Sequence, residues 1–428
     1  MLLEQVFGFE IGLFVGDCQC RGGMVACDDL VAASFAIGGR ATVFRRSFPF
    51  VVLALTVFAF NFSLGVSRTI QNNFWVDILK LRPDQMGLLI TLRETPGFLT
   101  MAVAAVTMRF VPSRLASLCF IVMAIGYYAY GLATSFGTII PGVMFASVGF
   151  HLWLTLNGSF GLAVAKDNDA GRTLGDLQSV GFAAGLIGMF GVFAGIGTIG
   201  YHLAFAISGI AMLVGAIAIT RFPSHIVHRS PQRIVVRRSY TLFYILNFLE
   251  GCRFELFQAF GIFLLVRQYL IPVQTIAILF IVTAVGSMLL SPPVGRLIDH
   301  WGERPTMTVG YVVMFVTFLG FALWHDGLAA IVLYVIYNIV LLSEIGVNTY
   351  LKKVAHPQDV RPSLATGVTM MHIPALIVPI LGGALWNAFG FEVPFLLGSC
   401  FIFASIIASQ FIPRRIAPTI LDSAAAIS

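Results

Sequence analysis

The stretch GRLIDHWGER, residues Gly295–Arg304, is a ten-residue polar segment lodged between two long apolar runs. A charged side chain at the centre of a membrane-spanning helix costs about 2.5–3.5 kcal/mol on insertion scales, so a cluster of charges must lie at a water face. A glycine on either side of Asp299 favours a close approach of helices followed by a tight turn. The stretch therefore predicts a polar connection between two membrane-spanning helices.

The composition is that of a membrane protein. Hydrophobic residues make up 58% of the 428 residues and charged residues 11%, against about 45–50% and about 25% in soluble domains. The formal charge of +6 is scattered over short segments between apolar runs. A nucleic-acid partner would require that charge on one soluble face, so the expected partner is the lipid bilayer and no nucleic acid.

Twelve apolar runs follow the first 46 residues, each near the roughly 20 residues that a helix needs to cross the hydrocarbon core. They lie near 48–68, 86–108, 113–132, 137–159, 175–197, 201–220, 240–265, 272–293, 306–324, 328–349, 364–388 and 393–412. Backbone groups in lipid must pair within their own segment, which requires helices. The predicted fold class is an all-α integral membrane protein with twelve transmembrane helices in two pseudo-symmetric six-helix bundles.

Lysine and arginine divide unequally between the two sides of such a chain. With the N-terminus in the cytoplasm, 20 of the 26 lie in cytoplasmic segments, four lie on the opposite side, and Arg93 and Arg253 lie inside spans. The four on the opposite side are Arg68, Lys80, Arg82 and Arg267. The positive-inside bias then places both termini in the cytoplasm.

Residues 222–238 form the longest charged connection and divide the spans into an N-terminal bundle, 47–221, and a C-terminal bundle, 239–412. Weak matches at an offset of about 190 residues pair Gly97 with Gly286 and Asn157 with Asn348. Parallel six-helix repeats are typical of one transporter architecture. The basic segment 222–238 is therefore interpreted as a cytoplasmic linker between two halves.

Residues 1–46 and 413–428 are expected to be cytoplasmic tails. Leu2–Gly16 is apolar but short and carries Glu4 and Glu10, which suits an interfacial helix or a stretch upstream of a true start at Met24. No basic segment precedes it, which argues against a cleaved signal peptide.

The six cysteines predict no disulfide framework. Cys18, Cys20 and Cys27 lie near acidic residues, but this is not a zinc spacing, and an unstructured tail is the favoured interpretation there. Cys119, Cys252 and Cys400 lie in apolar runs, where cysteine behaves as a small hydrophobe.

Gly295, Leu297, Asp299, Gly302 and Arg304 fill every fixed position of the pattern G-x-L-x-D-x-x-G-x-R. This pattern resembles the loop signature of the major facilitator superfamily, whose second copy falls between spans eight and nine. The resemblance covers residues 47–412 and implies alternating access, with Gly295, Asp299, Gly302 and Arg304 as a cytoplasmic gate in which Asp299 holds the outward-facing state. The alternative is that these charges only solvate a turn.

The first copy of the signature belongs between spans two and three and is largely lost here. That segment reads MRFVPSR, Met108–Arg114, with Arg109 near the place of the aspartate and Arg114 aligned with Arg304. The gate is therefore expected to be one-sided.

Three further stretches resemble a bacterial subgroup, permeases of the magnetosome membrane. They are RETPGF at Arg93–Phe98, GFH at Gly149–His151 and NFLEGCR at Asn247–Arg253. This nearer resemblance implies iron transport in biomineralization, at the bacterial inner membrane or the magnetosome membrane.

Among the ionisable residues inside predicted spans, eight are candidates for substrate binding or proton coupling. They are Arg93, Glu94, His151, Glu250, Arg253, Glu255, Glu344 and His372.

Glu250 and Arg253 are three residues apart and share a helix face. The carboxylate is either a substrate or proton site held by the arginine, or half of a self-neutralising pair. Glu255 lies about 140° round the helix from Glu250, which makes it the better proton carrier of the two.

Glu344 has no charged neighbour on its own helix. A lone buried carboxylate can load and release a proton near neutral pH, so Glu344 is the leading coupling candidate, with a hydrogen-bonded structural glutamate as the alternative.

Arg93 and Glu94 precede Pro96, at which a helix can bend, so they form either a charged hinge or a buried pair at a kink. His151 and His372 suit metal binding or proton relay, or simply packing.

No local metal-ligand spacing is present, so an iron site would need ligands from several helices. Glu94, Glu255, Glu344 and His151 are the residues that could converge, and carboxylate and imidazole would suit ferrous iron.

The sequence predicts a secondary active transporter that moves a small solute across a bacterial membrane, with proton coupling as a hypothesis. It contains no P-loop, which argues against ATP drive, and no cofactor is expected. The alternatives are a non-transporting scaffold or sensor with the same fold, or an efflux permease for a small organic solute. An enzyme is not expected because no nucleophile, metal or cofactor motif is recognisable.

Overall fold

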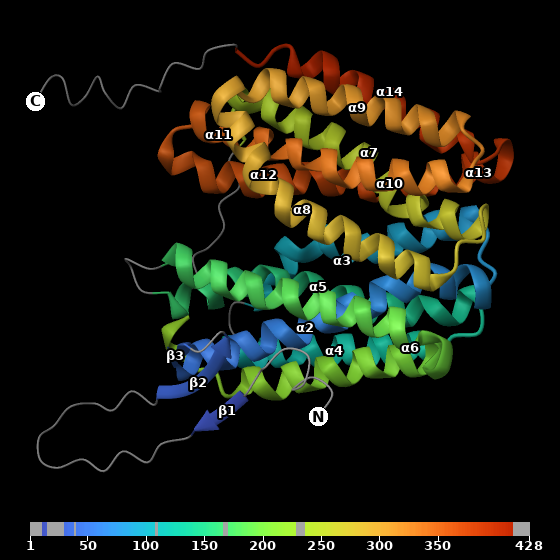
Figure 1. Ribbon diagram of the computed structural model, residues 1–428. Coiled ribbons are helices and arrows are strands. Elements are labelled where there is room, and N and C mark those ends of the chain that lie inside the picture. Colours follow the sequence, from blue (N-terminus) through green and yellow to red (C-terminus); the bar gives the residue numbers. More distant parts are fainter. Residues whose placement is uncertain are drawn as a thin grey trace, which may run out of the picture.

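The computed structural model describes residues 11–14, 30–37, 40–107, 110–165, 170–227 and 236–413. The N-terminal half contains α2 (Phe48–Asn73), its π-helical continuation η1 (Phe74–Ile78), α3 (Pro83–Thr107), α4 (Pro112–Leu132), α5 (Phe136–Val164) and α6 (Ala170–Thr220). The C-terminal half contains α7 (Thr241–Arg267), α8 (Val273–Trp301), α9 (Glu303–Leu323), α10 (Gly327–Val340), η4 (Leu341–Glu344), α11 (Ile345–Val354), α12 (Pro357–Ala375), α13 (Val378–Phe389) and α14 (Glu392–Ser409). Figure 1 shows the two groups of helices side by side, with α3 and α8 where they meet.

The helices of the described residues account for twelve membrane spans. Nine segments are long and apolar enough to cross a membrane. One of them, Arg172–Thr220, has 49 residues, about twice the length that a bilayer requires, and Gly200 breaks it with φ 71° and ψ 172°. α3 and α7, with 25 and 27 residues, carry central charges that set them apart from the nine. Nine segments, these two helices and the second arm of α6 together make twelve, and the predicted fold class is confirmed.

The polar connection around Asp299 is shorter than the sequence predicts. α8 continues through Trp301 and α9 begins at Glu303, so Gly302 alone separates them. Gly302 has φ 90°, a conformation that residues with a β-carbon rarely adopt. The expected ten-residue turn is wrong because charged residues at a water face can stay helical, and only this glycine reverses the chain.

Two predicted spans are interrupted at mid-length. The 3-10 turn η4 separates α10 from α11, and Leu376 and Ile377 separate α12 from α13. Pro374 and Pro379 flank the second break, and a proline removes a backbone donor and disfavours helix at the residue before it. The predicted spans 328–349 and 364–388 each remain one membrane-length segment, within Gly327–Val354 and Gln358–Phe389, with a local departure from the regular α-helix at mid-length.

The described part of the N-terminal segment is a small antiparallel sheet. It consists of β1 (Ile11–Phe14), β2 (Leu30–Ile37) and β3 (Arg40–Ser47), in the order β1-β2-β3, with Leu30 opposite Ser47 and Ile37 opposite Arg40. A short apolar run suits a strand or a helix equally until a pairing partner is known, so the interfacial helix expected over Leu2–Gly16 is wrong at Ile11–Phe14. The rest of that stretch, Met24 and the cysteines at 18, 20 and 27 lie outside the described residues.

The two halves pack against each other at the end of the bundle that holds the α2–α3 and α7–α8 connections, residues 79–82 and 268–272, which we call the far end. The side-chain amide of Asn73 donates to the Ile271 carbonyl at 3.1 Å, and Arg267 donates to the Leu81 carbonyl at 2.7 Å. Here α3 and α13 approach so closely that a β-carbon at Gly87 would overlap the Pro379 carbonyl.

The opposite end, called the linker end, holds residues 221–227 and 236–240 and the α8–α9 junction. The start of the linker is tied to α4, where the Ser224 hydroxyl donates to the Ser113 hydroxyl at 2.6 Å. Its end is tied to α12, where the buried Asp359 accepts a hydrogen bond from the Tyr240 hydroxyl at 2.9 Å and pairs with Arg237 at 2.9 Å. The linker is thus anchored in both halves.

Replacing Asp359 with alanine should release the linker from α12. Charge-assisted hydrogen bonds contribute about 1.5–3 kcal/mol each, so we expect tryptic cleavage after Arg237 or Arg238 to become at least about 10-fold faster through local opening. Limited proteolysis in detergent measures this, with Asp84→Ala, at the far end, as the control. Unchanged cleavage in Asp359→Ala would contradict the anchor.

Candidate functional site: a cavity between the two halves

A cavity of about 550 Å³ lies between the two halves. Its described lining comes from α2 to α6 on one side and from α7, α8, α10, η4 and α12 on the other. Aromatic side chains such as Trp75, Tyr127 and Tyr337 alternate there with polar groups such as Gln258 and Asn338. A cavity of this size with a few converging polar groups is typical of a binding site for a small solute.

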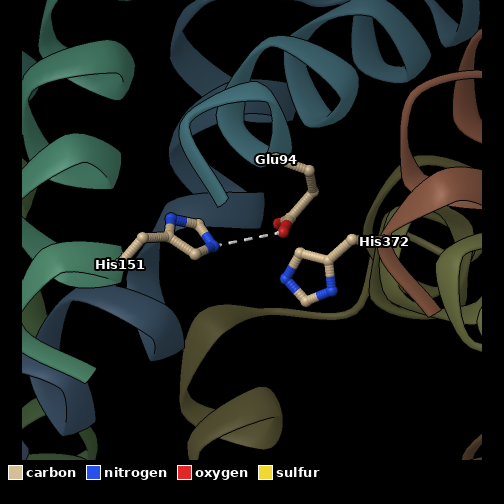
Figure 2. Close-up of side chains that lie close together, drawn as sticks. All are labelled: Glu94, His151 and His372. Carbon is tan, nitrogen blue, oxygen red and sulfur yellow. Dashed lines mark ion pairs between the residues drawn. The ribbon is translucent and has the colours of Figure 1, made fainter. Parts of the chain in front are cut away.

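Three ionisable side chains from different helices converge in this cavity. Glu94 of α3, His151 of α5 and His372 of α12 offer ligand atoms that all lie within 4.8 Å of one another, and Figure 2 shows the two imidazoles facing the carboxylate. Glu94 and His151 belong to the N-terminal half and His372 to the C-terminal half. Of the four residues predicted to converge, Glu94 and His151 meet here, Glu255 lines the same cavity outside this group, and Glu344 lies elsewhere.

Each member of this group is held by a neighbour. Arg93 donates to Glu94 Oε1 at 2.9 Å, while Glu94 Oε2 lies 3.6 Å from His151 Nε2. His151 Nδ1 lies 3.0 Å from the Ser147 carbonyl, and the Ser147 hydroxyl donates to the Arg93 carbonyl, which joins α5 to α3. Glu94 therefore pairs with Arg93 through one carboxylate oxygen, and its other oxygen faces His151, with which it forms an ion pair when the imidazole is protonated.

Two more charged groups line the same cavity. Glu255 is buried, and its Oε2 atom has no hydrogen-bond partner among the described residues. The Arg93 Nη2 atom is likewise buried without a partner there. Buried polar atoms are nearly always hydrogen-bonded in folded proteins, so these two are free to engage a solute or water in the cavity.

Arg68 is a cavity residue that the sequence places outside the membrane. α2 continues to Asn73 rather than ending near residue 68, so Arg68 lines the cavity and its guanidinium lies 5.4 Å from the centroid of the Phe150 ring. The predicted assignment of Arg68 to an external loop is wrong because the span is longer than the minimum. The sequence does contain a signal for the longer span, since apolar residues continue beyond Arg68.

Glu344 is not the isolated carboxylate that the sequence predicts. Arg253, fully buried in α7, donates to Glu344 Oε1, and the Tyr311 hydroxyl donates to Oε2 at 3.3 Å. The Arg253 guanidinium also lies 5.1 Å from the Tyr311 ring centroid. This group lies within the C-terminal half, and the described lining of the cavity does not include Glu344.

Arg253 thus pairs across helices and not with Glu250, the neighbour on its own helix face. Glu250 is half-buried and is not part of the described cavity lining. The predicted pairing of Glu250 with Arg253 is wrong because a partner on another helix lies nearer to the guanidinium.

The signature residues of the α8–α9 junction make their contacts within the C-terminal half. Arg304 donates to Gln410 Oε1 at 3.0 Å, and Glu303, which was not singled out in the sequence, is buried and pairs with Lys353 of α11 at 2.5 Å. Gly295 lies in α8, and Asp299 is exposed at the linker end. In the N-terminal half, Arg114 is exposed and Arg109 lies outside the described residues.

Comparison with known families and structures identifies the fold. Residues 239–425 match the model of the Major Facilitator Superfamily. The nucleoside transporter NupG, in a mutant form, superposes with a TM-score of 0.71 at 13% identity, covering 85% of this chain and 99% of that one. A POT family peptide transporter superposes at 0.70 with 14% identity, covering 87% and 98%.

A bacterial homologue of the human lysosomal transporter Spinster, in an inward-facing and occupied conformation, superposes with a TM-score of 0.65 at 16% identity, covering 86% of this chain and 98% of that one. No curated protein matches the chain. These similarities show a multi-pass membrane protein with the major facilitator fold, and they do not support the nearer resemblance to the magnetosome permease MamH.

Proposed function

We propose that this protein is a secondary active transporter that moves a small solute by alternating access. The observation that supports this most directly is the cavity of about 550 Å³ between the two halves, with buried polar atoms from both lacking partners among the described residues. In transporters built from two six-helix repeats, the solute binds near the middle of the membrane and the halves rock around it. The proposed halves are residues 47–221 and 239–412, joined by the linker 222–238.

The state seen here is closed at the far end. Asn73, Arg267 and the α3–α13 contact join the halves there, so we infer that the cavity opens at the linker end. The exposed Asp299 fits this state, because a gate that holds the linker end shut is released when that end opens. With the termini and the linker in the cytoplasm, this is an inward-facing state.

The coupling ion and the solute belong to the same proposal. Proton coupling is supported by Glu94 and Glu255, carboxylates that line the cavity, more than by Glu344, which is held by Arg253 and Tyr311. Iron as the solute, with a place in the inner or magnetosome membrane, is supported only by the sequence resemblance and the suitability of imidazole and carboxylate for iron. An organic solute is the second candidate, supported by Arg68, Arg93 and the aromatic lining.

A reversible lock at the far end tests transport against the scaffold or sensor alternative. We expect a cysteine pair at Asn73 and Ile271, in a chain without its native cysteines, to form a disulfide that stops rocking. The metal and metabolite content of cells with the locked protein should match that of a deletion strain, and a reductant should restore the wild-type content. If protons drive transport, dissipating the proton gradient should abolish the difference in solute content between cells with the unlocked protein and the deletion strain.

The control for the lock carries only one of the two cysteines and should behave as the unlocked protein throughout. A locked protein that is inserted normally and supports the wild-type solute content would contradict transport and favour the scaffold, because a scaffold does not need to move.

A further inference from the structure

We propose that Glu94, His151 and His372 form a binding site for a divalent first-row transition metal ion, which is the cargo of this transporter. The inference rests on the proposed function and names the chemical class of its solute. It is carried by the orientation of the two imidazoles, the space kept for them by Gly97, and the position of the three residues.

Both imidazoles are oriented as in metal sites. His151 Nδ1 lies 3.0 Å from the Ser147 carbonyl and His372 Nδ1 lies 3.1 Å from the Val368 carbonyl. A carbonyl oxygen only accepts, so each Nδ1 carries a proton, and the neutral form of each ring has its lone pair on Nε2. A metal-binding histidine commonly donates its other ring nitrogen to a backbone carbonyl in this way.

The third ligand fits the same pattern. Arg93 donates to Glu94 Oε1 and leaves Oε2 at 3.6 Å from His151 Nε2, which is too long for a hydrogen bond. With His151 protonated the two form an ion pair; with His151 neutral they present two acceptors to each other, and a metal cation between them would bind both. Ligand atoms on one metal ion stand about 3–4 Å apart when each bond is about 2.1 Å, so the present group, within 4.8 Å, needs to contract by roughly 1 Å.

Gly97 provides the room in which the imidazoles meet. It lies three residues after Glu94 on α3, so the two share a helix face. A β-carbon at this position would stand 2.5 Å from His151 Nε2 and 3.0 Å from His372 Cδ2. The absence of a side chain at Gly97 is therefore needed for both rings to take their present places.

The site lies at mid-membrane and is shared by the two halves. Glu94 is the twelfth of the 25 residues of α3, His151 the sixteenth of the 29 of α5, and His372 the fifteenth of the 32 of Gln358–Phe389. His372 comes just before the break between α12 and α13, and such interrupted helices commonly form transporter binding sites. Because His372 moves with the other half, rocking separates it from Glu94 and His151 and weakens the hold on the ion.

The donor set selects the class of ion. Two imidazoles and one carboxylate suit Fe²⁺, Co²⁺ and Zn²⁺, whereas Mg²⁺ and Ca²⁺ prefer oxygen ligands alone. Glu255 lines the same cavity with an unpartnered oxygen. An organic solute held by Arg68 and Arg93 is the competing outcome.

Titration of the purified, untagged protein with Co²⁺ tests the site, read by visible absorption and by calorimetry. We expect one Co²⁺ per chain, displaced by Zn²⁺ and not by Mg²⁺. His151→Ala, His372→Ala and Glu94→Gln should each weaken binding at least 10-fold, and Gly97→Ala should do the same by displacing both rings. His325→Ala, a far-end histidine with a 60% exposed side chain, is the matched control and should bind as the wild type does.

Titration of the wild-type protein with Co²⁺ tests whether the metal site exists even if a variant fails to fold. Absence of saturable Co²⁺ binding to the wild type, or binding that persists in folded His151→Ala and His372→Ala, would overturn the site. Binding by a protein that still functions when its far end is locked would keep the site and reject transport. Rocking and solute movement without Co²⁺ binding would keep transport and reject the metal cargo in favour of an organic solute.

Discussion

Replacing Arg253 with alanine is expected to destabilise the protein by about 3–5 kcal/mol, the usual cost of removing one partner of a buried ion pair. Arg253 is fully buried, and its loss would leave the Glu344 carboxylate, 8% exposed, with only the Tyr311 hydroxyl as a partner. Thermal unfolding in detergent, followed by size-exclusion chromatography, measures the loss. The pair joins α7 to η4, so its removal should loosen the C-terminal half in particular.

Two comparisons isolate this effect. Arg82→Ala removes an ion pair whose side chains are 60% and 35% exposed, and an exposed pair of this kind contributes at most about 1 kcal/mol. The double variant Arg253→Met, Glu344→Leu removes both buried charges and should recover most of the lost stability, because no unpaired charge remains.

Glu344→Gln tests whether Glu344 is a structural residue that stabilises the C-terminal half, which we call a brace, or the coupling residue that the sequence favours. We expect it to destabilise the protein markedly, since a neutral amide leaves the Arg253 charge unbalanced. If Glu344→Gln instead kept wild-type stability and removed only the dependence of transport on the proton gradient, the interpretation as a brace would be wrong.

Replacing Gly87 with alanine is expected to shift the conformational equilibrium away from the state described here. The added β-carbon would overlap the Pro379 carbonyl, and a β-carbon at Gly383 would likewise overlap the Pro83 carbonyl. Overpacking commonly costs about 1–3 kcal/mol. With RT about 0.6 kcal/mol, this cost changes the ratio of the far-end-closed to the far-end-open state by roughly 5- to 150-fold. The halves should therefore part more often at the far end.

Spin labels at Ile78 and Gln268, both exposed at the far end, can report this change by double electron–electron resonance. The distance distribution should gain a longer component in Gly87→Ala. Gly158→Ala, at a helical glycine with nothing within 4 Å of the added carbon, should keep the wild-type distribution. A Gly87→Ala protein with unchanged distances would mean that the α3–α13 contact does not hold the far end closed.

Much of the fold is predictable because it depends on local physics. Lipid imposes a length and an internal hydrogen-bond requirement on each apolar run, so all twelve spans are recognisable in the sequence. No proline marks the interruption at η4, so it depends on the neighbouring helices, whereas Pro374 and Pro379 beside Leu376–Ile377 are a signal that the sequence does contain. The prediction puts Arg68 in an external loop because it assumes a span of minimum length. α2 is longer, and the charged side chain of Arg68 is accommodated in the cavity.

The sequence predicts which residues are candidates for the site, but it does not predict which of their side chains come into contact. A charged or imidazole side chain inside a span is costly enough to attract notice by itself, so all eight candidates could be named from the sequence. Which of them meet could not be read from it: Arg253 and Glu344 are 91 residues apart, and Glu94 and His372 lie in different halves.

Twelve membrane-embedded helices follow from the sequence alone, because burial of apolar runs and internal backbone pairing are properties of each segment. The pairing of Arg253 with Glu344, and the meeting of Glu94, His151 and His372 in one cavity, depend on the three-dimensional packing. Such contacts depend on how each helix is rotated against its neighbours, and the packing of small residues such as Gly87 and Gly97 sets that rotation.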